Sequence, residues 1–262
     1  MTSDLRTRYG GWAVVTGASA GIGEATARLL AASGMRVVIC ARRRDRVEHL
    51  AAALRAAGGE ALAYGLDVTD AAAVRAMVDD VGARWGGIDV LVNNAGRGLS
   101  TTVEDTKPEE FRELLELNVM AVFTGTQAVL PWMRRAGRGH IINVSSIVGR
   151  RGVPFRGAYS ATKSALGGLS EALRVELTGS GIYVSLVYPI GTATEFHDVE
   201  VRRAGRGPQG PIQSSEHVAR TILRCIRRPR PEVYPFRPSW LFAVASVIAP
   251  RLVDLGVRRM LR

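Results

Sequence analysis

The chain has 262 residues, 47% of them hydrophobic, which suits one domain with a sizeable core. Its formal charge is +11, and residues 220–262 carry +8 of it, because ten arginines there stand against Glu232 and Asp254. No nucleic-acid-binding motif accompanies this charge, so we expect no nucleic-acid partner. The polar N-terminus does not resemble a secretory signal, and Cys40 and Cys225 are too few for a disulfide framework, which favours the cytoplasm.

Short apolar runs alternate with longer stretches of helical periodicity along the whole chain. Strands are predicted over residues 12–17, 36–41, 60–68, 88–96, 140–146, 182–189 and 231–236. Helices are predicted over residues 21–34, after residue 41, after Asp70, over 108–135, around Lys163 and over 214–228. Strands that alternate with helices in this way are typical of an α/β fold, in which a parallel sheet of about seven strands is covered on both faces.

A glycine-rich stretch, TGASAGIG at residues 16–23, follows the first predicted strand and opens the first predicted helix. Gly17, Gly21 and Gly23 stand where a tight turn, close approach of the backbone to a phosphate, and close helix–strand packing each exclude a side chain. The helix N-terminus offers free N–H groups and a positive dipole to a pyrophosphate. The stretch therefore predicts a Rossmann-like, doubly wound sheet that binds a dinucleotide, with a purely structural turn as the alternative.

The end of the second predicted strand bears on the choice of dinucleotide. It reads Ala41, Arg42, Arg43, Arg44, with no carboxylate before Asp45. In dinucleotide-binding sheets an acidic residue at this point binds the 2′-hydroxyl of NAD, whereas an arginine suits the 2′-phosphate of NADP. Arg42 would make charge-assisted hydrogen bonds to that phosphate. We therefore expect NADP(H), with NAD(H) as the alternative if these arginines form only a solvated turn.

Further motifs follow the glycine loop in a characteristic order. They are NNAG at residues 93–96, ELNVM at 116–120, NVSSIVG at 143–149, and Tyr159 followed four residues later by Lys163. Ser146 stands thirteen residues before Tyr159. In combination these motifs resemble the short-chain dehydrogenase/reductase family, in its compact single-domain branch, from about Gly11 to Phe196.

The resemblance implies functional residues at matching positions. The implied catalytic tetrad is Asn118, Ser146, Tyr159 and Lys163. The expected cofactor-binding residues are Gly17, Ser19, Gly21, Ile22, Gly23, Arg42, Asp67, Val68, Asn94, Ala95, Gly96, Tyr159, Lys163, Pro189, Thr192 and Thr194. An apolar substrate pocket would be lined by Ile147, Val148, Phe155, Tyr188 and Phe196, and no metal site is expected.

The chemistry of the tetrad can be argued from its residue types. Hydride transfer makes or consumes an alkoxide, so a proton must move at the substrate oxygen. A free tyrosine has a pKa of ~10, too high for a good base near neutrality. Lys163, one helical turn from Tyr159, adds positive charge that favours phenolate and lowers that pKa. Ser146 would bind the carbonyl oxygen, and in relatives the asparagine at the position of Asn118, in an irregular helix, holds a water that links the lysine to solvent.

We therefore predict an NADP(H)-dependent oxidoreductase that interconverts a hydrophobic ketone or aldehyde and its alcohol, with Tyr159 as the acid/base. The alternatives are an NAD-dependent alcohol dehydrogenase of the same family and a non-catalytic dinucleotide-binding or membrane-surface protein. Two positions depart from the family pattern. Ile190 replaces the usual glycine beside the nicotinamide, and Ala20 replaces a basic residue that many NADP-using relatives carry.

The expected organisation is a single domain over residues 1–262. Residues 8–195 would form the cofactor-binding and catalytic core, residues 196–213 a substrate lid, and residues 214–262 a helix, a strand and a basic apolar tail. A homodimer or homotetramer that buries C-terminal elements is the main expectation for this tail. The alternative is peripheral contact of residues 239–262 with an anionic membrane surface.

Overall fold

A seven-stranded parallel sheet forms the centre of the molecule in the computed structural model, which describes residues 5, 9, 11–195, 201–202 and 210–258. Its strand order is β11-β7-β6-β4-β1-β2-β3, and every neighbouring pair is parallel. The strands are β1 Trp12–Thr16, β2 Arg36–Ala41, β3 Ala61–Gly65, β4 Val90–Asn93, β6 Gly139–Val144, β7 Ile182–Val187 and β11 Glu232–Val233. The predicted α/β fold with a doubly wound parallel sheet is therefore confirmed.

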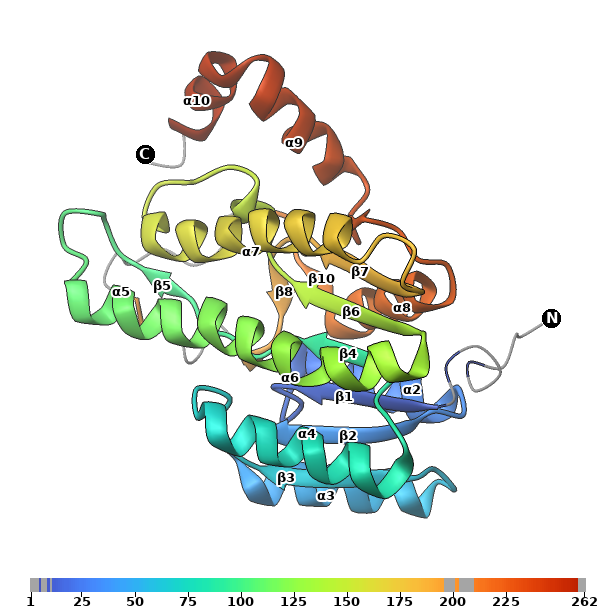
Figure 1. The fold of residues 1–262 in the computed structure, drawn as a ribbon. Coiled ribbons are helices and arrows are strands. Elements are labelled where there is room, and N and C mark those ends of the chain that lie inside the picture. The colour runs from blue at the N-terminus through green and yellow to red at the C-terminus, as the bar shows by residue number, and fades with distance from the viewer. Residues whose placement is uncertain (1–4, 6–8, 10, 196–200, 203–209, 259–262) are drawn as a thin grey trace.

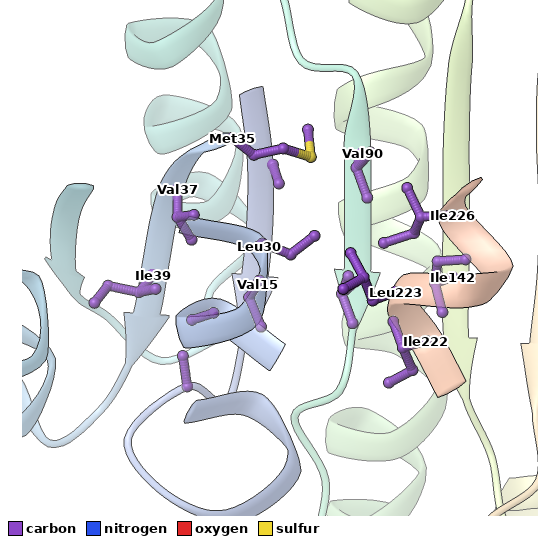
Figure 2. Packing of buried hydrophobic residues seen from close by; sticks show 14 of the residues in the cluster. Val15, Leu30, Met35, Val37, Ile39, Val90, Ile142, Ile222, Leu223 and Ile226 are labelled. Atoms are coloured by element: carbon purple, nitrogen blue, oxygen red, sulfur yellow. The ribbon is translucent and has the colours of Figure 1, made fainter. Parts of the chain in front are cut away.

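Helices cover both faces of this sheet (Figure 1). One face carries α2 Gly21–Ala32, α3 Arg44–Ala56 and α8 Ser215–Arg227. The other carries α4 Ala71–Trp85, α6 Ala121–Ala136 and α7 Gly157–Glu176. Each layer forms because alternate strand residues point to opposite faces, so that Val15 of β1 packs in one core and Val14 in the other. Figure 2 shows Leu30 of α2 and Ile222 of α8 in the first of these cores.

The remaining elements surround the carboxyl ends of the strands. They are the helices α5 Pro108–Leu115, α9 Pro238–Ile248 and α10 Pro250–Arg258, the π-helical turn η1 Glu116–Met120, the 3₁₀ turn η2 Ile147–Gly149, and the short strands β5 Leu99–Ser100, β8 Thr192–Ala193, β9 Val201–Arg202 and β10 Gln213–Ser214. The strand predicted over residues 231–236 is shorter than expected, since β11 has only two residues. The tail predicted over residues 239–262 is divided, because the chain bends by 119° between α9 and α10.

The helical run over residues 108–136 is long enough to span a membrane and contains an 18-residue window with a mean hydropathy of 1.2, apolar enough for such a span. In the fold, however, its second half packs against α4 and the sheet. Val129 and Met133 of α6 are completely buried there. The apolar character of this helix is therefore explained by its place in the core of the molecule.

The change of direction in the strand order determines where a ligand can bind. The chain builds β1, β2 and β3 outward on one side and then returns to place β4 on the other side of β1. At the ends of β1 and β4, Thr16 joins the two strands, because its hydroxyl accepts the N–H groups of Asn94 and Ala95, each at 3.0 Å. Ligands of doubly wound sheets bind in the crevice at such a switch point.

Candidate active site

The glycine loop between β1 and α2 is crowded on its protein side. Gly17 and Gly21 have positive φ angles of 65° and 61°, a region that favours glycine. A Cβ on Gly17 would lie 2.8 Å from Ala95 Cα, one on Gly21 would lie 2.8 Å from Thr194 Cγ2, and one on Gly23 would lie 2.4 Å from the Gly17 oxygen. Ala20 gives α2 no side-chain cap, so among the described residues no such cap competes with a ligand for the first-turn N–H groups.

A cleft of about 680 Å³ runs from this loop to the predicted tetrad. The predicted residues that line it are Gly17, Ser19, Gly21, Ile22, Arg42, Asp67, Val68, Asn94, Ala95, Gly96, Ser146, Ile147, Val148, Phe155, Tyr159, Lys163, Pro189, Thr192 and Thr194. Gly23, Asn118 and Tyr188 lie behind its wall, and Phe196 lies outside the described residues. Ile190, the departure from the family pattern, also lines the cleft. One continuous cavity is therefore lined by both the glycine loop and the Tyr159–Lys163 pair.

Tyr159 and Lys163 lie on one face of α7, turned toward the sheet. Both side chains are buried, at 5% and 4% exposure. The Lys163 Nζ donates a hydrogen bond to the carbonyl oxygen of Val144 at 2.9 Å and lies 5.9 Å from the centroid of the Tyr159 ring. Burial lowers the pKa of Lys163 to about 8. The lysine is therefore still largely protonated at neutral pH and lies beside the tyrosine ring.

Asn118 stands in a π-helical turn, Glu116–Met120, between α5 and α6. The side chain is fully buried. Its Oδ1 accepts the Arg97 N–H, and its Nδ2 donates to the Arg97 carbonyl and to the Thr162 hydroxyl, each at 3.0 Å. The irregular helix expected at this position is thus present. Asn118 fixes the backbone after Gly96 and contacts Thr162, the residue before Lys163 in the sequence.

The two serines after β6 have different surroundings. Both line the cleft, and the Ser146 Oγ accepts the Val148 N–H at 3.4 Å. Ser145 is buried, and its hydroxyl donates to the carbonyl oxygen of Lys163 at 2.8 Å. Ser145 therefore ties α7 to the end of the central strand. The sequence analysis does not assign this role to Ser145, although the NVSS motif contains both serines.

The adenosine end of the cleft contains two arginines with different partners. Arg42, the predicted phosphate ligand, is 74% exposed and lies 3.9 Å from the Asp67 carboxylate. The Arg43 guanidinium lies deeper over the loop and donates to Ser19 Oγ at 2.9 and 3.1 Å. Its Nη1 also lies 2.6 Å from the Glu195 carboxylate. The sequence analysis predicts Arg42 as the phosphate ligand. Arg43, which it did not single out, stands in the same arginine run and also lines the cleft.

Glu195 also accepts a hydrogen bond from Arg46, at 2.6 Å, so two arginines of the α3 N-terminus hold one carboxylate. These bonds, with that from Arg46 the stronger, lower the pKa of Glu195. The residue therefore remains negatively charged across the neutral range. This charge lies at the edge of the cofactor end of the cleft.

The substrate end of the cleft is mainly apolar. Ile147, Val148 and Phe155 line it as predicted, and Phe155 takes a positive φ of 63°. Pro238, Ser239 and Phe242 of α9 line it as well, together with Phe236 just before that helix. The sequence had shown this segment as an apolar tail with no indication that it reaches the cleft.

The prediction that Tyr188 lines the substrate pocket is wrong. Its side chain is only 1% exposed, stacks on Tyr234 with ring centroids 5.1 Å apart, and lies under the Arg150 guanidinium at 4.5 Å. Burial raises the pKa of its hydroxyl well above the usual range. The ring points away from the cleft because β11 brings Tyr234 alongside the end of β7. Tyr188 is a packing residue.

The fold and the cleft together define a dinucleotide-binding oxidoreductase built on a doubly wound sheet. Residues 11–204 match the family model described as short chain dehydrogenase. The chain therefore belongs to the short-chain dehydrogenase/reductase family, whose members act on carbonyl and CH–OH groups.

Known proteins of similar sequence and structure agree with this assignment. The chain is 33% identical to ketoacyl reductase HetN of Nostoc sp. over 256 residues, which cover 95% of this chain and 89% of the relative. It is 35% identical over 222 residues to glycine betaine reductase of Emericella nidulans, covering 83% of this chain but only 18% of that protein.

Two solved structures superpose on most of the chain. A short chain dehydrogenase/reductase from Burkholderia phymatum in complex with NAD matches with a TM-score of 0.82 and 26% identity, covering 95% of both chains. A metagenomic short-chain oxidoreductase in complex with NADP matches with a TM-score of 0.74 and 35% identity, covering 86% of this chain and 96% of the other.

Proposed function

We propose that this protein is an NADP(H)-dependent reductase of hydrophobic ketones or aldehydes, with Tyr159 as the acid/base. The observation that carries the proposal is the shared cleft, in which Tyr159, Lys163 and Ser146 lie at one end and the glycine loop lies at the other. A Cβ at Gly17 or Gly21 would clash with residues on the protein side, so the loop keeps its backbone N–H groups close to the cavity. These features fit a bound nicotinamide dinucleotide.

The glycine loop and the first turn of α2 would hold the pyrophosphate, and Asp67 and Val68 would lie beside the adenine. Asn94, Ala95, Gly96, Pro189, Thr192 and Thr194 would line the nicotinamide half. When bound, the nicotinamide supplies or accepts the hydride. The apolar lining from Ile147, Val148, Phe155, Phe236 and the first turns of α9 supports a hydrophobic carbonyl compound as the substrate.

The proton at the substrate oxygen is handled by the residues of the tetrad. In reduction the Tyr159 hydroxyl donates its proton to the oxygen as the alkoxide forms, and in oxidation the phenolate takes it back. Protonated Lys163 favours the phenolate by its charge. Ser146 holds the carbonyl oxygen against Tyr159 by a hydrogen bond. Asn118 positions the backbone of Arg97 and contacts Thr162, the residue before Lys163. Its role is therefore to hold α7, which carries Lys163, in position against the cleft wall.

The preference for NADP(H) rests on charge at the adenosine end. Arg42 and Arg43 both line the cleft, and a 2′-phosphate between them would gain charge-assisted hydrogen bonds. The metagenomic relative crystallised with NADP supports this choice, and the Burkholderia relative crystallised with NAD keeps NAD(H) as the alternative. The similarity to a ketoacyl reductase supports β-keto acyl compounds as the first substrates to examine.

Replacement of Tyr159 by Phe tests the proposal. We expect ethyl acetoacetate, a simple β-keto ester, to be reduced by the wild type with NADPH, and the variant to lose turnover about 10²–10⁴-fold. NADPH binding should persist, because the ring remains. Tyr183→Phe, on the outer part of β7 and 43% exposed, is the matched control and should keep full activity.

Three results would contradict the proposal in different ways. Turnover that survives in the Tyr159→Phe variant would remove the acid/base role of this tyrosine. Tight NADPH binding by the wild type, with no reduction of any β-keto ester or aliphatic ketone, would favour a non-catalytic dinucleotide-binding protein. Faster oxidation of alcohols with NAD would favour the alternative dehydrogenase.

The organisation of the whole chain is also a proposal. We propose a single domain over residues 1–262, with the core at 8–195, a lid at 196–213 and the C-terminal elements at 214–262. Most residues of the proposed lid lie outside the described part of the chain. Within the described part, β9 pairs with β5, whose Ser100 lines the cleft, and this supports the proposal. A cytoplasmic homodimer or homotetramer remains a prediction, and light scattering at several concentrations would measure its mass.

A further inference from the structure

Helix α9 buries its more polar face and exposes its more apolar face. The side chains that it buries are small or polar, namely Ser239, Ala243 and Ser246. The opposite face, spaced at i, i+1, i+7 and i+8, carries the larger apolar side chains Trp240, Leu241, Val247 and Ile248, which are 52%, 62%, 81% and 77% exposed. A helix of a water-soluble protein normally turns its apolar stripe inward. The exposed face of α9 therefore suits an apolar surrounding outside the chain.

The next helix continues this apolar surface. No residue of α10 is buried, and Leu252 and Leu255, three positions apart on one face, are 70% and 60% exposed. Figure 1 shows α9 and α10 projecting from the body of the molecule beyond α7. Together the helices are apolar enough for a membrane span, but the chain bends by 119° between them. Each alone would extend roughly 15 Å, about half of a bilayer core, which suits a position in the interface.

The charge of this segment favours an anionic surface. Residues 237–262 contain five arginines and one acidic residue, Asp254. Arg151 forms an ion pair with Asp254, so the single negative charge is already matched from outside the segment. Arg237, Arg251 and Arg258 are exposed in the described part of it. Arginines beside exposed tryptophan and leucine are the composition of helices that lie on anionic bilayers.

The same segment forms part of the substrate end of the cleft. Phe236, Pro238, Ser239 and Phe242 line the cavity, while Trp240 and Leu241 between them point outward. The cleft wall and the exposed apolar face therefore belong to the same turns of one helix. They are separated by about the diameter of that helix, on the order of 10 Å.

We propose that α9 and α10 dock the protein on an anionic lipid bilayer and that its substrate is a carbonyl compound with an acyl chain, which enters the cleft from that bilayer along α9. Docking depends only on the surface of α9 and α10. The substrate class rests on the proposed reductase function. A second copy of the chain is the other candidate to cover this surface. It is disfavoured because a symmetric contact would bring two strongly basic segments together.

Vesicle co-sedimentation tests the docking without any turnover. We expect the wild type and the Tyr159→Phe variant to bind mixed vesicles of phosphatidylglycerol and phosphatidylcholine. Both proteins should bind vesicles of phosphatidylcholine alone at least tenfold more weakly. The double variant Trp240→Ser/Val247→Ser should lose at least tenfold in binding. Val175→Ser, an equally exposed apolar residue of α7 at 73%, is the matched control and should bind as the wild type does. Arg251→Gln/Arg258→Gln should weaken binding to anionic vesicles only.

Several outcomes would overturn the docking. The first is that the wild type does not sediment with anionic vesicles. The second is that the Trp240→Ser/Val247→Ser variant binds them equally well. The third is that the wild type is a dimer without lipid whereas this variant is a monomer. A blue shift of tryptophan fluorescence on adding vesicles, absent in the variant, would support it, because Trp240 is an exposed tryptophan on the docking face.

The substrate class is tested on the same proteins with a long-chain β-keto ester dissolved in the vesicles. We expect the wild type to reduce it at least tenfold faster than the Trp240→Ser/Val247→Ser variant, while both reduce ethyl acetoacetate in solution equally well. Equal rates on the vesicle-bound ester would overturn delivery from the bilayer. If the wild type reduces neither the long-chain ester nor ethyl acetoacetate, the proposed function is contradicted, whereas the vesicle-binding result is unaffected.

Discussion

Arg43 and Glu195 join the two sides of the cofactor end of the cleft. The Arg43 Nη1 lies 2.6 Å from Glu195 Oε2, and the same guanidinium binds Ser19 Oγ in the glycine loop. Arg43 stands at the start of α3, whereas Glu195 follows β8, 152 residues later in the chain. A 2′-phosphate that binds beside Arg43 would therefore compete with the Glu195 carboxylate for one guanidinium.

Removal of the Glu195 charge should strengthen the binding of NADPH. Glu195→Gln keeps the size of the side chain but removes a negative charge that both attracts Arg43 and repels a phosphate. Exposed ion pairs are weak because solvent screens them, so we expect NADPH to bind only about two- to fivefold more tightly and NADH to bind unchanged. Titration of both cofactors by fluorescence measures this. An equal gain for NADH would show that the change does not act through the 2′-phosphate.

The two arginines should differ in their contribution to cofactor preference. Arg43→Ala should weaken NADPH binding by about 10–100-fold, because one or two charge-assisted hydrogen bonds to the 2′-phosphate are lost. NADH binding should be nearly unaffected. Arg42→Ala should have a smaller effect, because its side chain is 74% exposed. Dissociation constants for both cofactors and both variants check this order. A larger effect at Arg42 would restore the assignment made from the sequence.

The sheet could be predicted from the sequence because its signals are local. The predicted strand over residues 36–41 coincides with β2. A short run of β-branched apolar residues between two helical segments favours a buried strand over a helix. The strands predicted over 60–68 and 88–96 run too far, because the apolar pattern continues past β3 and β4 into residues that line the cleft, such as Val68 and Ala95.

The site was predictable only where its geometry follows the chain. Tyr159 and Lys163 share a face because they are one helical turn apart, and their proximity needs no knowledge of the fold. The contact of Arg43 with Glu195 and the approach of Phe242 to the cleft depend on where distant segments meet. Tyr188 was misplaced for the same reason, since Arg150 and Tyr234, which hold its ring, come from two other parts of the chain.

The stability of the cofactor-free protein should depend on pH through Lys163. Burial lowers its pKa from 10.5 to about 8. Between these values the unfolded chain binds the extra proton, so this residue makes the free energy of unfolding rise as the pH rises. At ~1.36 kcal/mol per pH unit the full effect is about 3 kcal/mol. Urea unfolding at several pH values, for the wild type and Lys163→Met, measures it.

The comparison with the variant is needed because Cys40 acts in the opposite direction. Burial raises the pKa of its thiol to about 12, so its contribution to stability is lost as the pH rises through the alkaline range. The difference between the wild type and Lys163→Met cancels this contribution. A difference that stays constant from about pH 7 to pH 10.5 would contradict a lowered pKa at Lys163.

Asn118 should matter for both stability and turnover. Asn118→Ala leaves the partly buried N–H and C=O of Arg97 without their side-chain partner, which should lower the free energy of unfolding by about 1–3 kcal/mol. Because the backbone beside the cleft loosens, kcat should fall more than NADPH affinity. Thr126→Val, which removes a buried hydrogen bond to Asn93 away from the cleft, is the control and should keep its kcat. Equal kcat in both variants would reduce Asn118 to a structural role.

Gly82 of α4 is fixed by the indole of Trp132, which packs directly on it from α6. A Cβ on Gly82 would lie 2.2 Å from the Trp132 ring. Gly82→Ala should therefore cost about 1–3 kcal/mol of stability through overpacking, despite the better helix propensity of alanine. Gly168→Ala in α7 is the matched control, since nothing among the described residues lies within 4 Å of its added methyl.

We expect Gly168→Ala to be neutral or to stabilise the protein by up to about 1 kcal/mol. Thermal or urea unfolding of both variants gives the comparison directly. Trp132→Leu should restore part of the loss in Gly82→Ala, because a smaller side chain makes room for the methyl group, so the two changes should be non-additive. Additive losses would show that the strain at Gly82 does not come from the indole, and that α4 and α6 adjust their spacing instead.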